Sequence, residues 1–191
     1  MSKEVVAISA YLASDRFLED RKNVDDRAAI NIIFHKAAEV CGGDTTEALL
    51  SASFACVPFN VIPAVTPIFN IKIPLRIYSA DEETFQRKNR NLPRRFFLDT
   101  PRYGYGDKDK IAHFFGAAFI THASNSVELS EYIGYLVEVI ESMLMVDPID
   151  ERDIRADILG ANFGELLLQK KQVQPSDVFT FYLLSSISFV L

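Results

Sequence analysis

The stretch DIRADILGANFG, residues 153–164, holds the pattern that decides the fold. Spacings of four, three and four residues place one set of side chains in a single stripe of an α-helix: Asp153, Asp157, Gly160 and Gly164. A glycine inside a helix costs about 1 kcal/mol relative to alanine. Two glycines on one face therefore predict helix packing in which a neighbouring backbone approaches closely.

Two more helices are expected directly before this one. The three helices are predicted at about 108–124, 129–146 and 151–170, because Pro148 and Pro175 interrupt the helical pattern after the second and third. The loops between them are short, and short loops make neighbouring helices antiparallel. The C-terminal part of the chain, 107–191, is therefore predicted to be a helical module.

The N-terminal segment, 1–57, is also predicted to be helical. Residues 25–41 carry an apolar stripe, and a pair of glycines follows that stops the helix. The sequence DTTE then begins at Asp44 and has the form of a capping box, which starts a second helix that runs to about Val57.

The middle segment, 58–106, is expected to be a Pro-rich arm followed by a basic loop. Its prolines exclude a long helix. Residues 70–78, NIKIPLRIY, alternate between apolar and other side chains, which is typical of a half-buried strand, and Pro74 restricts this strand to an edge. A short capped helix is expected from Ser79 onward.

Together these segments predict a mainly α protein that forms one structural unit. The expected fold is a compact antiparallel helical bundle with a Pro-rich extended arm and at most one short edge strand. Of the 191 residues, 49% are hydrophobic, which is enough for a core and excludes global disorder.

Ionisable side chains on the three C-terminal helices are positioned to meet. Asp109 and His113 share one face of the first helix. In the second helix at least one of Glu138 and Glu141 must face inward or an interface, because their neighbours are apolar. The candidate metal ligands are His113, Glu141, Asp153 and Asp157.

Three interpretations of this cluster stay open from the sequence. One histidine among several carboxylates suits a hard or borderline divalent metal ion. The same residues could hold an acid–base pair with His113 and Asp109 as the catalytic candidates. The third interpretation is a buried structural network that fixes the register of the helices.

The charge distribution offers a possible anion site. Residues 70–110 are basic and lie between acidic flanks. Arg94, Arg95 and Lys110 are the candidate anion-binding residues, although pairing with nearby surface carboxylates is the favoured explanation of the two arginines. Lys110 is expected to pair with an acidic neighbour or to reach a phosphate, outside the cluster. No nucleic-acid motif is present and the isoelectric point is near 5.1, so nucleic acid is not an expected partner.

Three elements of this region, taken in order, resemble the VanZ-like family and the related YfiM-like predicted lipoproteins. The stretch DKIAHFF, residues 109–115, is similar to their Asp-Lys-x-x-His-Phe element, and Glu141 takes the place of a glutamate on the next helix. The third element is matched by Asp153, Ala156, Asp157, Gly160 and Gly164. The resemblance covers about residues 107–168 and implies a compact helical module with a shared polar cluster, often at a membrane.

Location and partners follow from hydropathy. No signal peptide is visible, and no segment reaches the roughly 18–20 apolar residues of a membrane span. A cytoplasmic or peripheral membrane location is expected. The arm, 57–78, and the apolar tail, 178–191, are the segments expected to contact a protein partner or a membrane surface.

Three functions are compatible with these features. The leading expectation is a helical interaction or scaffold protein, such as a peripheral subunit of a membrane-associated assembly. The second is a metal-assisted hydrolase acting on a phosphate- or lipid-linked substrate, in which the anion candidates hold the substrate. The third is a small-ligand or lipid-binding module.

Overall fold

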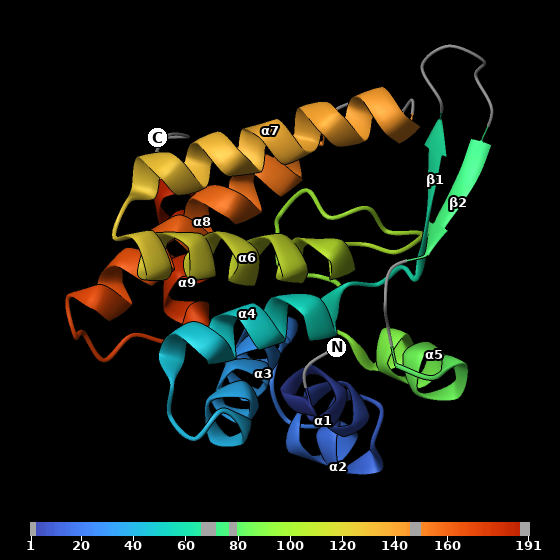
Figure 1. Ribbon diagram of the computed structural model, residues 1–191. Coiled ribbons are helices and arrows are strands. Elements are labelled where there is room, and N and C mark those ends of the chain that lie inside the picture. Colours follow the sequence, from blue (N-terminus) through green and yellow to red (C-terminus); the bar gives the residue numbers. More distant parts are fainter. Residues whose placement is uncertain (1–2, 66–71, 77–79, 146–149, 188–191) are drawn as a thin grey trace.

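The computed structural model describes residues 3–65, 72–76, 80–145 and 150–187, and it is built mainly from helices (Figure 1). For the strands beyond Val61, and for residues 140–145 and 187, only the backbone is described. The N-terminal helices are α1 (Lys3–Leu12), α2 (Asp15–Asp20), α3 (Asp26–Val40) and α4 (Thr45–Cys56). They are followed by β1 (Val61–Val65), β2 (Lys72–Arg76) and α5 (Glu82–Asn91). The C-terminal helices are α6 (Lys108–Ser124), α7 (Val127–Met145), α8 (Glu151–Leu168) and α9 (Pro175–Ile187).

Aspartates begin several of these helices. The side chain of Asp25 accepts a hydrogen bond from the backbone N–H of Ala28 at the start of α3, and Asp44 accepts one from Glu47 at the start of α4. Asp81 caps α5, which therefore begins at Glu82 and not at Ser79. Ser79 itself lies outside the described residues.

The arm contains a β-hairpin, so the expectation of at most one short strand was wrong. β1 and β2 pair antiparallel, with Val61 opposite Arg76 and Pro63 opposite Pro74. Proline cannot donate to the ladder, but antiparallel strands alternate between pairs that exchange hydrogen bonds and pairs that do not. Two prolines opposite each other fit a pair of the second kind, which is why prolines did not prevent pairing here.

Helix α6 is the central element, and it packs against α8, α4 and α7 (Figure 1). Its fully buried Phe114 lies 5.4 Å from the ring of Phe163 on α8 and 4.9 Å from the ring of Phe179 on α9. Phe163 is in turn 5.2 Å from Phe34 on α3. Helices from both ends of the chain therefore share one hydrophobic core.

The apolar tail expected to contact a partner belongs partly to this core. Helix α9 starts at Pro175, where proline is well tolerated because the first helical N–H has no partner within the helix. Val178 and Phe179 are buried, whereas Phe181 and Leu184 are exposed. Residues 188–191 lie outside the described chain.

The two glycines of α8 lie where this helix crosses α6. A Cβ atom on Gly160 would lie 2.1 Å from the carbonyl oxygen of Phe114, and one on Gly164 would lie 2.5 Å from that of Ala118. Both distances are far below van der Waals contact, so only glycine permits this separation of the two helices.

Asp107 fixes the basic loop to the helices. Its carboxylate is fully buried and accepts hydrogen bonds from the backbone N–H groups of Phe96 and Phe97 at 3.0 and 3.2 Å. It also forms an ion pair of 3.1 Å with Arg152 of α8. The loop is therefore held against the start of α8, next to the polar cluster described below.

Replacing Asp107 by alanine is expected to lower the free energy of unfolding by about 3 kcal/mol, because Arg152 and two backbone N–H groups lose a buried partner. Asp99→Ala is the matched control. Asp99 pairs with Arg155 at 2.9 Å, but its side chain is 51% exposed, so its loss should cost less than about 1 kcal/mol. Urea denaturation of both variants measures the difference; equal losses would contradict this account of the loop.

Candidate functional site

Four ionisable side chains from three helices converge on the side of α6 that faces α7 and α8. They are His113 of α6, Glu138 of α7, and Asp153 and Asp157 of α8. The side chain of His113 is 15% exposed, and none of the three carboxylates is more than 9% exposed. Such burial is rare for charged groups unless they are paired or bind a metal ion.

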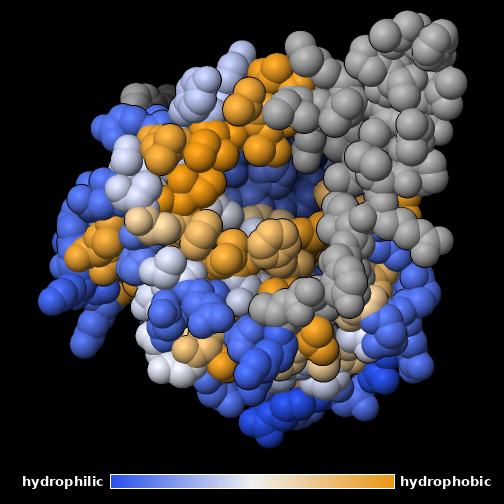
Figure 2. Space-filling model, in the orientation of Figure 1, coloured by the Kyte–Doolittle hydropathy of each residue, from blue (hydrophilic) through white to orange (hydrophobic). Residues whose placement is uncertain are grey.

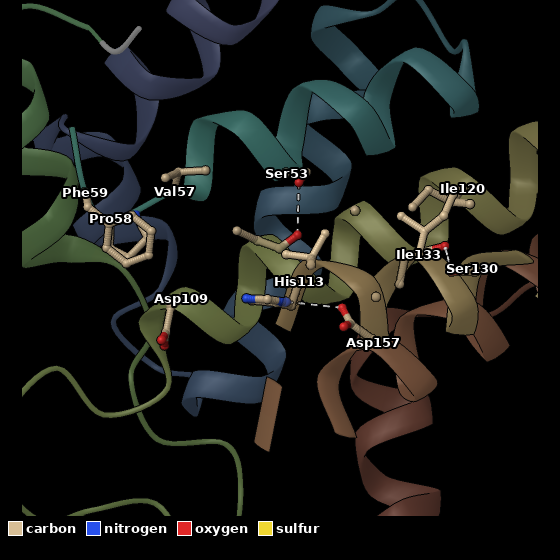
Figure 3. A pocket seen from close by; sticks show the side chains of 15 residues that line it. Ser53, Val57, Pro58, Phe59, Asp109, His113, Ile120, Ser130, Ile133 and Asp157 are labelled. Atoms are coloured by element: carbon tan, nitrogen blue, oxygen red, sulfur yellow. Dashed lines mark hydrogen bonds and ion pairs between the residues drawn. The ribbon is translucent and has the colours of Figure 1, made fainter. Parts of the chain in front are cut away.

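The imidazole of His113 lies between the carboxylates. Its Nδ1 is 3.3 Å from Oδ1 of Asp157, the interaction drawn in Figure 3, and 3.8 Å from Oε1 of Glu138. Its Nε2 is 3.5 Å from Oδ1 of Asp153. We refer to His113, Glu138, Asp153 and Asp157 as the His113 cluster.

Lys110 lies beside this cluster and is itself surrounded by carboxylates. Its Nζ is 2.8 Å from Asp109 Oδ2, 2.8 Å from Asp150 Oδ2 and 2.9 Å from Asp153 Oδ1. The expectation that Lys110 pairs with an acidic neighbour is met, but the expectation that it stays outside the cluster was wrong. The side chain is long enough to reach back to α8, where Asp153 is shared with His113. Lys110 is only 2% exposed, so it is not positioned to receive an anion from solvent.

The pKa values show how strongly these groups interact. Burial alone would lower the pKa of His113, but the hydrogen bond to Asp157 and the nearby carboxylates raise it to about 9. Burial raises the pKa of Asp153 to about 6, although His113 and Lys110 oppose the shift. Burial opposes the charge of Lys110 as well, but Asp109 and Asp153 outweigh it and raise the pKa of the ammonium group.

The other residues predicted from sequence lie at different places. Glu141 is in α7, but its side chain lies outside the described residues. Glu138, one turn earlier, is the glutamate that faces inward. Arg94 and Arg95 are exposed, and their backbone N–H groups donate to Asp26 at 3.0 and 2.9 Å. Neither arginine is among the side chains that form the cluster.

A pocket of about 260 Å³ opens beside the His113 cluster, between α4, α6 and α7. His113, Asp109 and Asp157 form its polar part (Figure 3). The rest of the described wall is mostly apolar and includes Val57, Pro58, Phe59, Ala112, Ala117, Ile120, Ile133 and Val137. Figure 2 shows a hollow with a hydrophilic floor between the apolar surfaces of α7 and α6.

Gly134 of α7 is a site residue that sequence reasoning missed. A Cβ atom there would lie 2.6 Å from Oδ2 of Asp157, so glycine makes room for this carboxylate. Ser130, Gly134 and Glu138 are each four residues apart, and all three are buried. That stripe of small and acidic residues mirrors the stripe of α8 and is the signal that could have identified Glu138.

The cluster has the composition of a metal centre. Three possible ligand atoms lie within 4.8 Å of one another, one each from His113, Glu138 and Asp153. In addition, the buried Oδ2 of Asp157 has no hydrogen-bond partner among the described residues. A buried carboxylate oxygen without a partner is costly, and a cation would remove that cost.

Comparisons with known proteins give no family assignment: no family model, no curated protein and no solved structure matches this chain. The similarity of residues 107–168 to the VanZ-like and YfiM-like families therefore stays a prediction. Among the described residues, no helix is both long enough and apolar enough to cross a membrane.

Titration of His113 predicts a pH-dependent stability for the metal-free protein. Its pKa is about 9 in the folded chain and near 6.5 in the unfolded chain, so its proton favours folding below pH 6.5. That contribution is lost as the pH rises from 6.5 to 9, and it is on the order of 3 kcal/mol.

Urea denaturation in EDTA at pH 6 and pH 9 measures this effect. From pH 6 to pH 9 the free energy of unfolding of the wild type should decrease by more than that of His113→Gln. Lys88 is buried and has a pKa lowered to about 8, but it is common to both proteins and cancels in the comparison. Parallel pH profiles for the two proteins would show that His113 is not stabilised in its protonated form.

Proposed function

We propose that this protein binds one divalent metal ion in the His113 cluster and uses it for hydrolysis of a molecule held in the adjacent pocket. One observation carries the proposal. One ligand atom each from the half-buried His113 and the buried Glu138 and Asp153 lies within 4.8 Å of the other two, beside a buried Asp157 oxygen that has no hydrogen-bond partner among the described residues. A purely structural network would be expected to satisfy each such atom.

The geometry assigns different roles to the four residues. His113 donates from Nδ1 to Asp157, which leaves Nε2, the nitrogen nearer to Asp153, to bind the metal ion. A carboxylate that holds a metal-binding histidine in this way fixes its tautomer and orientation. Asp153 and Glu138 complete a set of three protein ligands, which leaves coordination positions for water and substrate.

Charge also favours a cation. Lys110 is surrounded by Asp109, Asp150 and Asp153, so its single positive charge is already shared. Glu138 and Asp157 add two further carboxylates to the same interior. A divalent ion would add positive charge to this acidic interior and would displace the proton from His113, because only neutral imidazole binds metals.

A metal ion held by these residues would lower the pKa of a bound water molecule and would polarise the bond to be cleaved. Asp157 lines the pocket, and its carboxylate is the group that would take a proton from that water. The water oxygen forms a bond to the electrophilic atom, the bond to the leaving group breaks, and Asp157 returns the proton to the leaving group.

Asp157→Asn tests the function because it removes the proton acceptor and keeps the three ligands. The variant is expected to retain a bound metal ion with its affinity reduced roughly 10- to 100-fold, and to lose hydrolysis even when saturated with metal. Wild-type hydrolysis should stop in EDTA and return when metal is restored. Hydrolysis that survives EDTA, or an Asp157→Asn protein as active as the wild type, would overturn the proposed function.

The second candidate is the interaction protein, and the surface of α7 favours it. Large apolar side chains on this helix are exposed: Leu129, Tyr132, Tyr135 and Leu136. Leu129, Tyr132 and Leu136 have the spacing of one helix face. Such a face suits a protein partner or peripheral attachment to a membrane.

Charge reversal on this face tests the second candidate. Tyr132→Glu combined with Leu136→Glu should abolish any self-association seen by sedimentation velocity and any flotation with lipid vesicles, without unfolding the chain. A wild-type protein that is monomeric and remains unbound to vesicles would leave the hydrolase as the better account.

A further inference from the structure

The pocket extends along α6, and the face of α6 that lines it changes from the polar Asp109 and His113 to the apolar Ala117 and Ile120. Its wall on α6 includes His113, Gly116, Ala117 and Ile120, which follow one face of the helix. From His113 to Ile120 the helix advances about 10 Å at 1.5 Å per residue. Ile133 of α7 lines the same far part of the pocket (Figure 3).

The size of the pocket limits what it can hold. Its volume of about 260 Å³ lies just below the range of roughly 300–1,000 Å³ that is common for ligand pockets. An unbranched apolar chain that begins at His113 and ends near Ile120 fits this shape. A whole diacyl lipid does not fit it.

The side-chain charges of the pocket disfavour a strongly anionic head group. Among its described lining residues the ionisable side chains are Asp109, His113 and Asp157, and none is a lysine or an arginine. Lys110 is held by three carboxylates, and Arg94 lies on the exposed loop. Apart from the proposed metal ion, a phosphate would therefore meet two carboxylates and no basic side chain among the described lining residues.

We infer that the substrate is a neutral carboxylic ester with an unbranched apolar acyl chain, which lies along α6 while its carbonyl group faces His113. This inference rests on the proposed hydrolase function and replaces the phosphate-linked substrate expected from the sequence. Water adds its oxygen to the acyl carbon, and the bond from that carbon to the alkoxy oxygen breaks. Asp157 takes a proton from the water and passes it to the alkoxy oxygen, so the products are a carboxylic acid and an alcohol.

The probe is a series of p-nitrophenyl esters with acetyl, butanoyl, hexanoyl, octanoyl and dodecanoyl chains, supplied to the metal-loaded full chain. Each buried CH2 group contributes about 0.8 kcal/mol, so kcat/KM should rise roughly fourfold per added CH2 until the pocket is full. Beyond that length the rise should stop. p-Nitrophenyl phosphate, with the same leaving group, should be hydrolysed at least about 100-fold more slowly than the best ester.

Ile133→Trp tests whether the chain lies where the structure places it. Filling the far end should leave kcat/KM for the acetyl ester within about twofold and lower that for the octanoyl ester at least tenfold. Tyr103→Trp is the control, because Tyr103 is 89% exposed and is not among the pocket residues, and it should change neither value.

The outcomes separate the two proposals. Metal-dependent cleavage of the phosphate in preference to the esters, or ester cleavage that does not depend on chain length, would overturn the substrate inference and keep the hydrolase. A metal-loaded protein that cleaves neither probe would overturn the hydrolase and the inference together. A protein that binds no metal would also overturn both proposals. Metal analysis of the same sample distinguishes a protein without metal from a metal-loaded protein that is inactive.

Discussion

Replacing Gly160 by alanine is expected to destabilise the protein by about 3 kcal/mol or more. The added Cβ atom would lie 2.1 Å from the carbonyl oxygen of Phe114, and also within 3 Å of its carbonyl carbon and Cα atom. These are backbone atoms of α6, so relief requires the whole helix to move, and overpacking of this kind costs about 1–3 kcal/mol and sometimes more.

The sign of this effect is informative because helix propensity opposes it. Alanine in place of glycine at an unconstrained helical position stabilises by about 1 kcal/mol. Asn162→Ala provides the matched control, since Asn162 is exposed on the same helix, and its replacement should be neutral or slightly stabilising. Urea denaturation gives both values. A Gly160→Ala protein as stable as the wild type would show that α6 and α8 are not in close contact at this point.

The second large effect is expected at the proposed metal site. His113→Gln and Asp153→Asn each remove one of three proposed ligands, and each is expected to weaken binding of Zn²⁺ or Mn²⁺ by well over 100-fold. The basis for this magnitude is that loss of a residue that only orients a ligand already costs roughly 10- to 100-fold. Isothermal titration of EDTA-treated protein, after removal of the chelator, measures the affinities.

His35→Gln is the control for adventitious binding by a histidine. His35 lies on α3, is exposed, and is not part of the His113 cluster, so its loss should leave the affinity unchanged. Circular dichroism should show that each variant keeps its helices. Equal affinities for the wild type and His113→Gln would place the metal elsewhere or nowhere.

The helical part of the fold could be predicted from local signals. Proline positions and apolar stripes predicted three C-terminal helices at about 108–124, 129–146 and 151–170, and the structure has α6, α7 and α8 there. Asp44 was predicted to cap a helix, and its carboxylate does so. These features depend on residues close in sequence, where physical rules are strong.

The hairpin could not be predicted in the same way. β1 was not predicted because Pro63 interrupts its sequence. Its pattern alone also does not show which segment pairs with it. The register places Pro63 opposite Pro74, and neither strand's own sequence pattern specifies this partner. Strand pairing and its register depend on the packing around both strands.

The site was predicted in part. Two stripes, Asp109 with His113 and Asp153 with Asp157, indicated the right faces of α6 and α8. Glu141 was chosen in place of Glu138, because residues three apart lie on neighbouring parts of one helix face and the stripe of Ser130, Gly134 and Glu138 was not used. Contact between Gly134 and Asp157 sets how α7 is turned, and that contact places Glu138 in the cluster.

The measurement that tests the central claim most directly is the metal content of the purified full chain. The protein would be equilibrated with Mn²⁺, Fe²⁺ or Zn²⁺, dialysed against metal-free buffer and analysed by inductively coupled plasma mass spectrometry. The account predicts about one ion per chain for at least one of these metals, lost in His113→Gln. A folded wild-type protein that retains none of them would contradict the account and would make the His113 cluster a structural network.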